Sequence, residues 1–219
     1  MKDDPFSGLE APKVDPREFP AWILFEDEDF LAVNKPGWLV CHPSKDGPWS
    51  SLVGACREHC GQEKLHLVSR LDRETSGVVL LAKNRPAASF AQKAVEARLA
   101  RRSYLTILEG EANAPMVADG WLGKDPDSAV FVKQRVTRRS AKAKRSLTKF
   151  EPLLAHGGFT LATVHPESGR KHQIRAHAQW LGHPLVGDKL YGPDETLYLE
   201  FVTEGWTSRL DEFLAMKRQ

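Results

Sequence analysis

Short apolar runs of strand length recur along this chain, and they constrain its fold more than any other feature. They adjoin through short turns as often as through helices. Parallel strands need long crossover connections, so this arrangement favours the α+β class over a doubly wound parallel sheet. We expect one mixed, largely antiparallel sheet flanked by helices and loops. The predicted strands cover residues 22–25, 30–34, 77–84, 103–110 and 159–164.

Three segments predict helices. The first is "SSLVGACREHCG", with a serine as N-cap and Gly61 as its stop. The second covers residues 84–99, because Asn84 can cap a helix and the apolar residues that follow fall at helical spacing. The third lies within residues 171–184 and ends at Gly182.

The chain of 219 residues is long enough to bury a sizeable core, and nothing inside it resembles a linker. We therefore expect a loose acidic leader over residues 1–20 and one domain over residues 21–219. The leader has no apolar segment typical of a secretory signal, and no run reaches the roughly 18 residues of a membrane span. The three cysteines have no disulfide-framework spacing, which favours a reducing, cytoplasmic location.

Charge is distributed unevenly, although the net charge is only +2. Residues 1–30 carry nine acids and three bases, whereas residues 128–150 carry eight bases and no acid. A basic block of this kind suits a polyanion, because each neutralised phosphate releases counterions. A solvated surface is the alternative, and the block by itself favours it.

The segment "HLVSRLDRETSGVVLLAKN" places Asp72 between Arg70 and Arg73. Nearby positive charge favours an ionised carboxylate, which suits a nucleophile or a base and not a general acid. An aspartate that caps a turn between two solvated arginines is the simpler interpretation of this segment alone.

The segment from His165 to Gly192 carries a second group of polar residues. Lys171 and Arg175 fall on one face of the predicted helix, opposite an apolar face, so Arg175 can point towards a cleft. The Gly169–Arg170 pair opens that helix, where backbone N–H groups suit a phosphate. Its histidines lack the spacing of a helical zinc pair, so we expect no metal.

Tyr104 lies on one face of a predicted strand, where a tyrosine usually belongs to the core. In a cleft it could instead stack on a base or accept a proton. No glycine-rich loop fits a dinucleotide or a nucleotide phosphate, and no nucleophile elbow is present, so we expect no cofactor.

Taken together, these segments resemble the RluA-type family of RNA pseudouridine synthases. "RLDRETSGVVLLAKN" is similar to the family's R-L-D-x-x-T-S-G segment, and "GRKHQIRAHAQWLGHPLVGDKLYG" resembles its G-R-T-H-Q-I-R segment almost throughout. "VNKPGWLVCHPS", "RRSYLTILEG" and "KRSLTKFEPL" match three further family segments in the family's order. The resemblance covers roughly residues 25–192.

The resemblance implies isomerisation of uridine to pseudouridine in ribosomal or transfer RNA by a stand-alone catalytic domain. It places the family's catalytic aspartate on Asp72, its base-stacking, proton-handling tyrosine on Tyr104, and the arginine paired with the catalytic carboxylate on Arg175. It also implies that Arg70 enters the RNA stack when the target base leaves. No cofactor, metal or membrane is implied, and we expect a monomer.

Other basic and polar side chains are expected to contact RNA with Arg70. They are Arg73, Arg138, Arg139, Lys142, Lys144, Arg145, Arg170, Lys171, His172 and Gln173.

The sequence departs from the family pattern in three places. Ser69 stands where a histidine is usual, and Lys171 stands where a threonine is usual. The chain also ends about where the family usually continues into a further strand, so we expect either that this branch of the family is short or that the 219 residues omit a C-terminal piece of the domain. Two rival functions stay open: a non-catalytic RNA-binding module, and a carboxylate-based hydrolase with Glu167 or Asp188 as its second acid.

Overall fold

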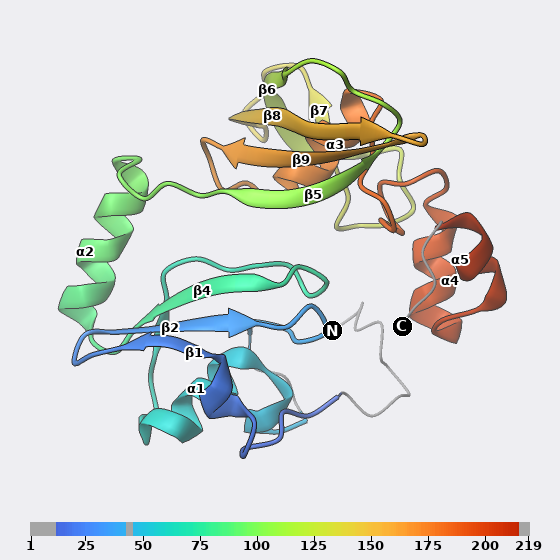
Figure 1. Ribbon diagram of the computed structural model, residues 1–219. Coiled ribbons are helices and arrows are strands. Elements are labelled where there is room, and N and C mark those ends of the chain that lie inside the picture. The colour runs from blue at the N-terminus through green and yellow to red at the C-terminus, as the bar shows by residue number, and fades with distance from the viewer. Residues whose placement is uncertain (1–11, 43–45, 215–219) are drawn as a thin grey trace. The chain divides into compact units, whose positions relative to one another are not determined.

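A computed structural model describes residues 12–42 and 46–214 of this chain. The chain divides into two compact units, and the boundary in the sequence falls between Ala100 and Arg101. Each unit has its own antiparallel sheet and its own buried core. Figure 1 labels most of the helices and strands of both units.

The amino-terminal unit is built on a four-stranded antiparallel sheet in the order β1-β2-β4-β3. Its strands are β1 (Ile23–Glu26), β2 (Phe30–Lys35), β3 (His66–Leu67) and β4 (Gly77–Ala82). Its α-helices are α1 (Leu52–Cys60) and α2 (Arg85–Glu96), and its short 3-10 helices are η1 (Phe19–Trp22) and η2 (Pro48–Ser50).

Local signals set the ends of these helices. The Ser51 hydroxyl accepts a hydrogen bond from the Gly54 amide at 3.1 Å and begins α1. Gly61 follows α1 with a left-handed φ of 61°, which glycine adopts without steric strain. Asn84 caps α2 through the Ala87 amide at 2.9 Å. The predicted caps are therefore confirmed.

Part of the expected leader belongs to the core of this unit. Val14 and Phe19 are only 3% and 1% exposed and pack with the apolar residues of β2 and β4. Burial of an aromatic and a branched side chain stabilises this stretch against the unit, so it is packed and not loose. Residues 1–11 of the leader lie outside the described residues.

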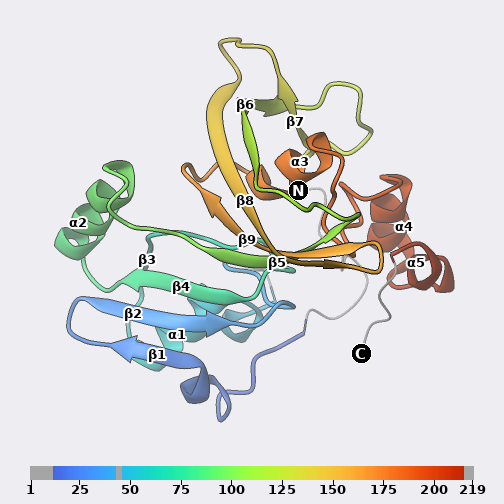
Figure 2. The ribbon, with the colours of Figure 1, turned by 45° about the horizontal axis from the view of Figure 1, so that its top comes forward.

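The carboxy-terminal unit is built on a five-stranded antiparallel sheet in the order β5-β9-β8-β6-β7 (Figure 2). Its strands are β5 (Tyr104–Glu109), β6 (Met116–Lys124), β7 (Gln134–Thr137), β8 (Lys144–His156) and β9 (Phe159–Pro166). Its helices are α3 (Gln173–Trp180), α4 (Thr196–Glu204) and α5 (Ser208–Phe213). Helix α3 packs against β6, β7, β8 and β9.

The α+β class is confirmed, and every strand pairing in the two sheets is antiparallel. Two differences from the sequence prediction stand out. The expected single long sheet is divided into two sheets, one in each unit. The strand prediction from periodicity also omits β3, β6, β7 and β8, and the helix prediction omits α4 and α5, because these segments are short or mix polar and apolar residues without a clear period. The C-terminal residues 215–219 lie outside the described residues.

Within the described part of the chain, no helix is long and apolar enough to cross a membrane.

His177 of α3 is a fully buried histidine of the carboxy-terminal unit, with no exposed surface. Its Nε2 lies 3.0 Å from the Ser146 hydroxyl and its Nδ1 lies 2.8 Å from the Thr148 hydroxyl. Ser146 donates to the Gly120 carbonyl, and Thr148 accepts from the Gln173 amide. These partners fit a neutral ring in which Nε2 donates and Nδ1 accepts.

Burial lowers the pKa of His177 from 6.5 to about 4. The unfolded chain therefore binds a proton at His177 between about pH 6.5 and pH 4, while the folded chain does not. As far as His177 is concerned, the free energy of unfolding is therefore highest above about pH 6.5, and it falls as the pH is lowered towards 4.

We expect this histidine to remove roughly 3 kcal/mol from the free energy of unfolding between neutral pH and pH 4, at about 1.4 kcal/mol for each pKa unit. Urea unfolding of the wild type and of His177→Gln, measured across this range, checks the prediction. The variant should have a lower free energy of unfolding at neutral pH, but this free energy should fall less than that of the wild type on acidification. Parallel curves for the two proteins would contradict it.

Candidate functional site

Asp72 lies in the turn that joins β3 to β4 in the amino-terminal unit. The Thr75 amide donates to the Asp72 carbonyl at 3.1 Å, which closes the turn. The two flanking arginines differ in their surroundings. Arg70 is exposed, and its Nη1 lies 3.0 Å from Nε2 of His42. Arg73 is half-buried.

Lys35 is a fully buried cation beneath this turn, and sequence reasoning did not single it out. Its Nζ donates to the carbonyls of Pro36, Leu39 and Arg73 at 2.8, 2.7 and 2.9 Å. All three ammonium protons are thereby used. Burial lowers the pKa of Lys35 to about 8, while electrostatic interactions with Cys41 and Asp72 partly oppose this shift.

Cys41 holds the other side of the same turn. Its Sγ lies 3.3 Å from the Leu71 carbonyl, and burial raises the pKa of this thiol. The peptide groups on both sides of Asp72, at Leu71 and Arg73, are therefore held by buried side chains. A carboxylate supported in this way is preorganised for a ligand or a reaction. The signal for Lys35 was present in the quoted "NKP" segment.

Tyr104 is the first residue of β5 in the carboxy-terminal unit, opposite Val164 of β9. It shares a strand face with Thr106 and Leu108, as the alternation predicts. The ring is half-buried and packs at the margin of the core formed by Leu108 and Phe150.

Arg175 extends from α3 and forms a two-point ion pair with Asp188. Its Nε and Nη2 donate to the two carboxylate oxygens at 2.6 and 2.7 Å. Its guanidinium also lies 4.9 Å from the centre of the Tyr191 ring, a cation–π contact. The predicted pair between Arg175 and Asp72 joins residues of different units and stays a prediction.

Asp188 is almost completely buried, with a side chain that is 4% exposed. Burial opposes its ionisation, but the hydrogen bonds and charge of Arg175, with the amides of Leu190 and Tyr191, lower its pKa below the ordinary value. The carboxylate accepts four hydrogen bonds from protein donors, three at Oδ1 and one at Oδ2. Asp188 therefore fixes the orientation of Arg175.

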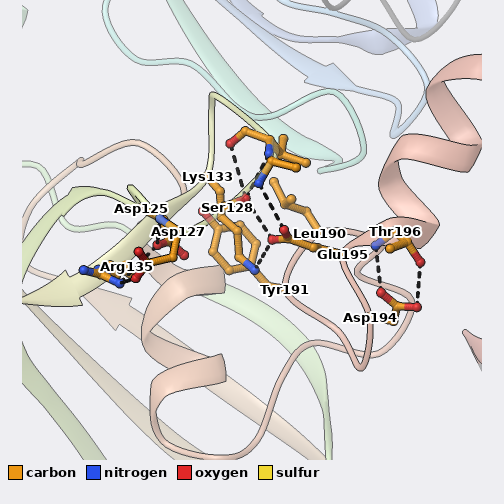
Figure 3. A network of polar contacts seen from close by, with 12 residues as sticks. Asp125, Asp127, Ser128, Lys133, Arg135, Leu190, Tyr191, Asp194, Glu195 and Thr196 are labelled. Carbon is orange, nitrogen blue, oxygen red and sulfur yellow. Dashed lines mark hydrogen bonds and ion pairs between the residues drawn. The ribbon is translucent and has the colours of Figure 1, made fainter.

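Tyr191, which contacts Arg175, also lies beside a polar network that includes Lys133, Ser128 and Glu195 (Figure 3). Its hydroxyl accepts from the Gln134 amide at 2.7 Å and lies 2.9 Å from Nδ1 of His172. Beside it, Glu195 accepts from Lys133 and from the Ser128 hydroxyl, both at 2.8 Å (Figure 3). The network ties α4 to the segment between β6 and β7.

The Gln173 side chain holds the backbone and the Ser168 side chain of the segment just before α3. Its amide oxygen accepts from the Ser168 hydroxyl and the Arg170 amide, and its amide nitrogen donates to Leu147 and Thr148. Gln173 is 4% exposed and is fully used inside the protein, so it is not among the residues that we propose to contact RNA. His172 is half-buried with a left-handed φ of 52°, while Arg170 and Lys171 are exposed.

The bases of the block over residues 128–150 fall into two groups, those that pair with an acid and those that are exposed. Lys133, Arg135, Arg145 and Lys149 each form an ion pair with an acid. Arg138, Arg139, Lys142 and Lys144 are exposed, and Arg139 lies over the Trp121 ring at 5.4 Å. Arg145, predicted to contact RNA, is held by Asp119 at 2.7 Å.

Within residues 12–42 and 46–214, no group of three or more histidine, cysteine, aspartate or glutamate side chains could hold a metal ion.

Comparison with known proteins gives a consistent family assignment. The family model described as RNA pseudouridylate synthase matches residues 29–180, which is more than half of the chain. An uncharacterized RNA pseudouridine synthase of Mycoplasma pneumoniae is 39% identical over 187 residues, 82% of this chain and 58% of the relative. The dual-specificity RNA pseudouridine synthase RluA of Vibrio cholerae is 33% identical, over 80% of this chain and 70% of the relative.

Solved structures agree with the sequence comparisons. The chain is similar to human RNA pseudouridylate synthase domain containing 4, with a TM-score of 0.65 and 26% identity over 81% of this chain and 71% of that structure. The first curated relatives are longer, and the chain spans about three fifths of their length.

We expect Lys35→Met to loosen the Asp72 turn, because the apolar side chain fills the space but leaves three carbonyls without their donor. Amide hydrogen exchange at Thr75 should accelerate at least about tenfold, equivalent to about 1.4 kcal/mol of lost protection. Lys83→Met is the matched control, since Lys83 pairs with Glu26 and does not bond to the turn. Equal exchange at Thr75 in both variants would refute the assigned role of Lys35.

We expect Asp188→Asn to lower the free energy of unfolding by about 3 kcal/mol, because it removes one partner of a buried ion pair. Asp194→Asn provides the control, since Asp194 pairs with Arg209 at a 40% exposed site, where solvent screens the pair, so its loss should be much smaller. Urea unfolding measures both. A small loss for Asp188→Asn would show that the pair does not support the fold.

Proposed function

Because this chain belongs to the family of RNA pseudouridylate synthases, we propose that it isomerises uridine to pseudouridine in RNA, with Asp72 as the catalytic carboxylate. The observation that carries this proposal is the construction of the Asp72 turn, whose flanking carbonyls are both held by buried side chains. A turn that only capped a strand would not need a buried lysine beneath it.

The reaction breaks the N1–C1′ bond of uridine, turns the uracil and joins C5 to C1′. The C5 proton is lost and a proton returns to N1, so no atoms are gained or lost overall. A glycosidase needs a second carboxylate to activate water, whereas water would be a side reaction here. One carboxylate is therefore sufficient, and the choice between attack on the sugar, attack on the base and removal of a sugar proton is left open.

Tyr104 and Arg175 complete the proposed machinery. Tyr104 stacks on the displaced uracil and takes part in removal of the C5 proton. Arg175 is proposed as the counter-ion to Asp72, as the family resemblance implies. Asp188 holds the Arg175 guanidinium at two points and so fixes its orientation.

The substrate requires a base to leave the RNA stack, at a cost of a few kcal/mol. Arg70, exposed beside His42, is the residue that we propose to fill the gap. Arg73, Arg170, Lys171 and His172 are proposed to contact the surrounding RNA, which is ribosomal or transfer RNA. We further propose that the protein acts as a monomer in the cytoplasm.

The hydrolase alternative lacks a free second carboxylate among the acids suggested for it. Asp188 is taken up by Arg175 and two amides, and Glu167 lies 3.3 Å from the Lys149 ammonium. The alternative of a non-catalytic RNA-binding module predicts RNA binding without reaction. It gives no reason for the support beneath Asp72.

A tritium-release assay on RNA labelled at C5 of uracil tests the proposal. We expect the wild type to release tritium and Asp72→Asn to be at least about a hundredfold slower, because it lacks the reactive carboxylate. Asp27→Asn is the matched control, since Asp27 closes a distant turn through backbone amides that an asparagine also satisfies. Release of free uracil would indicate a hydrolase. A wild type that binds RNA but releases no tritium would leave only the binding module.

A further inference from the structure

The eight bases of residues 128–150 have two different environments. Four of them have carboxylate partners at 2.7–3.3 Å, where Lys133 pairs with Glu195, Arg135 with Asp125, Arg145 with Asp119 and Lys149 with Glu167. For Arg138, Arg139, Lys142 and Lys144, no carboxylate of residues 12–42 and 46–214 lies within 4.0 Å of a side-chain nitrogen. Half of the block is therefore not neutralised within the described structure.

The four bases without a carboxylate partner are contiguous in the fold. Three lie in the β7–β8 loop (residues 138–143), and Lys144 is the first residue of β8. Strands β7 and β8 lie on opposite sides of β6, so this loop must cross from one side of β6 to the other. Figure 2 shows it projecting beyond the strands that it joins.

The loop is anchored although its charges are exposed. Ala143 is 6% exposed, and its amide donates to the Ser140 carbonyl at 3.2 Å. The Arg139 guanidinium lies 5.4 Å from the centre of the Trp121 ring on β6. These contacts restrict the loop, so less conformational entropy is lost when its side chains bind a ligand. The fixed positive charges then suit a ligand with regularly spaced negative charges.

We propose that the β7–β8 loop with Lys144 is a phosphate-binding arm, which holds the RNA backbone without reading its sequence. This proposal rests on the proposed function, because it assigns part of the RNA surface of the same enzyme. Lysine and arginine side chains that contact phosphates supply affinity and position, whereas bases are recognised by other contacts. The four ion-paired bases contribute little, because their charges are already offset by acids.

Two triple variants that each remove three positive charges test the arm. The arm variant is Arg138→Gln, Arg139→Gln and Lys142→Gln, and the control variant is Arg135→Gln, Arg145→Gln and Lys149→Gln. Binding of a short fluorescein-labelled oligouridylate is measured by anisotropy over a series of salt concentrations. We expect the arm variant to bind at least tenfold more weakly at low salt, with a salt slope smaller by about two, since each phosphate contact contributes roughly 0.7 to 0.9.

The control variant should keep most of the wild-type slope, because its three charges are engaged within the protein. An arm variant with the wild-type affinity and slope would overturn the proposal, as would equal losses in both variants. Urea unfolding of each variant shows that it is folded. Asp72→Asn separates this proposal from the proposed function: loss of tritium release with an unchanged salt slope supports both. A wild type that binds through the arm but releases no tritium refutes only the isomerase.

Discussion

The ion pair between Arg175 and Asp188 is the interaction on which the carboxy-terminal unit depends. Removing two charges from water is unfavourable unless both are fully satisfied. Asp188 meets this condition by accepting from Arg175 at two points and from the amides of Leu190 and Tyr191. The same four bonds fix a side chain of α3 and the turn that carries the Tyr191 ring. One carboxylate thus determines both the local backbone and the direction of the guanidinium.

The amino-terminal unit orders its own candidate residue by a related device. Lys35 is a buried cation whose nearest partners are carbonyl dipoles and not a carboxylate, so burial lowers the pKa of its ammonium to about 8. Because the Arg73 carbonyl is one of those partners, the ammonium supports the backbone beside Asp72. The negative charge of Asp72 in turn raises the pKa of Lys35. The Asp72 carboxylate therefore helps to keep the buried ammonium charged, while the ammonium holds the backbone beside Asp72.

Much of the fold could be predicted where local signals act alone. Ser51, Gly61 and Asn84 set helix ends through bonds within a few residues, and their roles were readable from sequence. The roles of Lys35 and Asp188 could not be read from the sequence, because they depend on partners up to 38 residues away in the chain. A lysine in a polar motif and an aspartate before a turn look like surface residues until tertiary contacts bury them. The burial of Gln173 likewise depends on partners 25 and 26 residues away, on β8.

Four of the eight bases in the basic block are neutralised by acids and four are not, and their positions on strands or on a loop explain the difference. Strands bring residues distant in the chain side by side, and Arg145 on β8 meets Asp119 on β6 in this way. A loop that leaves the sheet has no paired neighbour on either side, so its charges keep their field in solvent. Sequence composition counts both kinds of base equally, although only the second retains its full attraction for a polyanion. Strand pairing therefore concentrates the free positive charge of the block on the β7–β8 loop and Lys144.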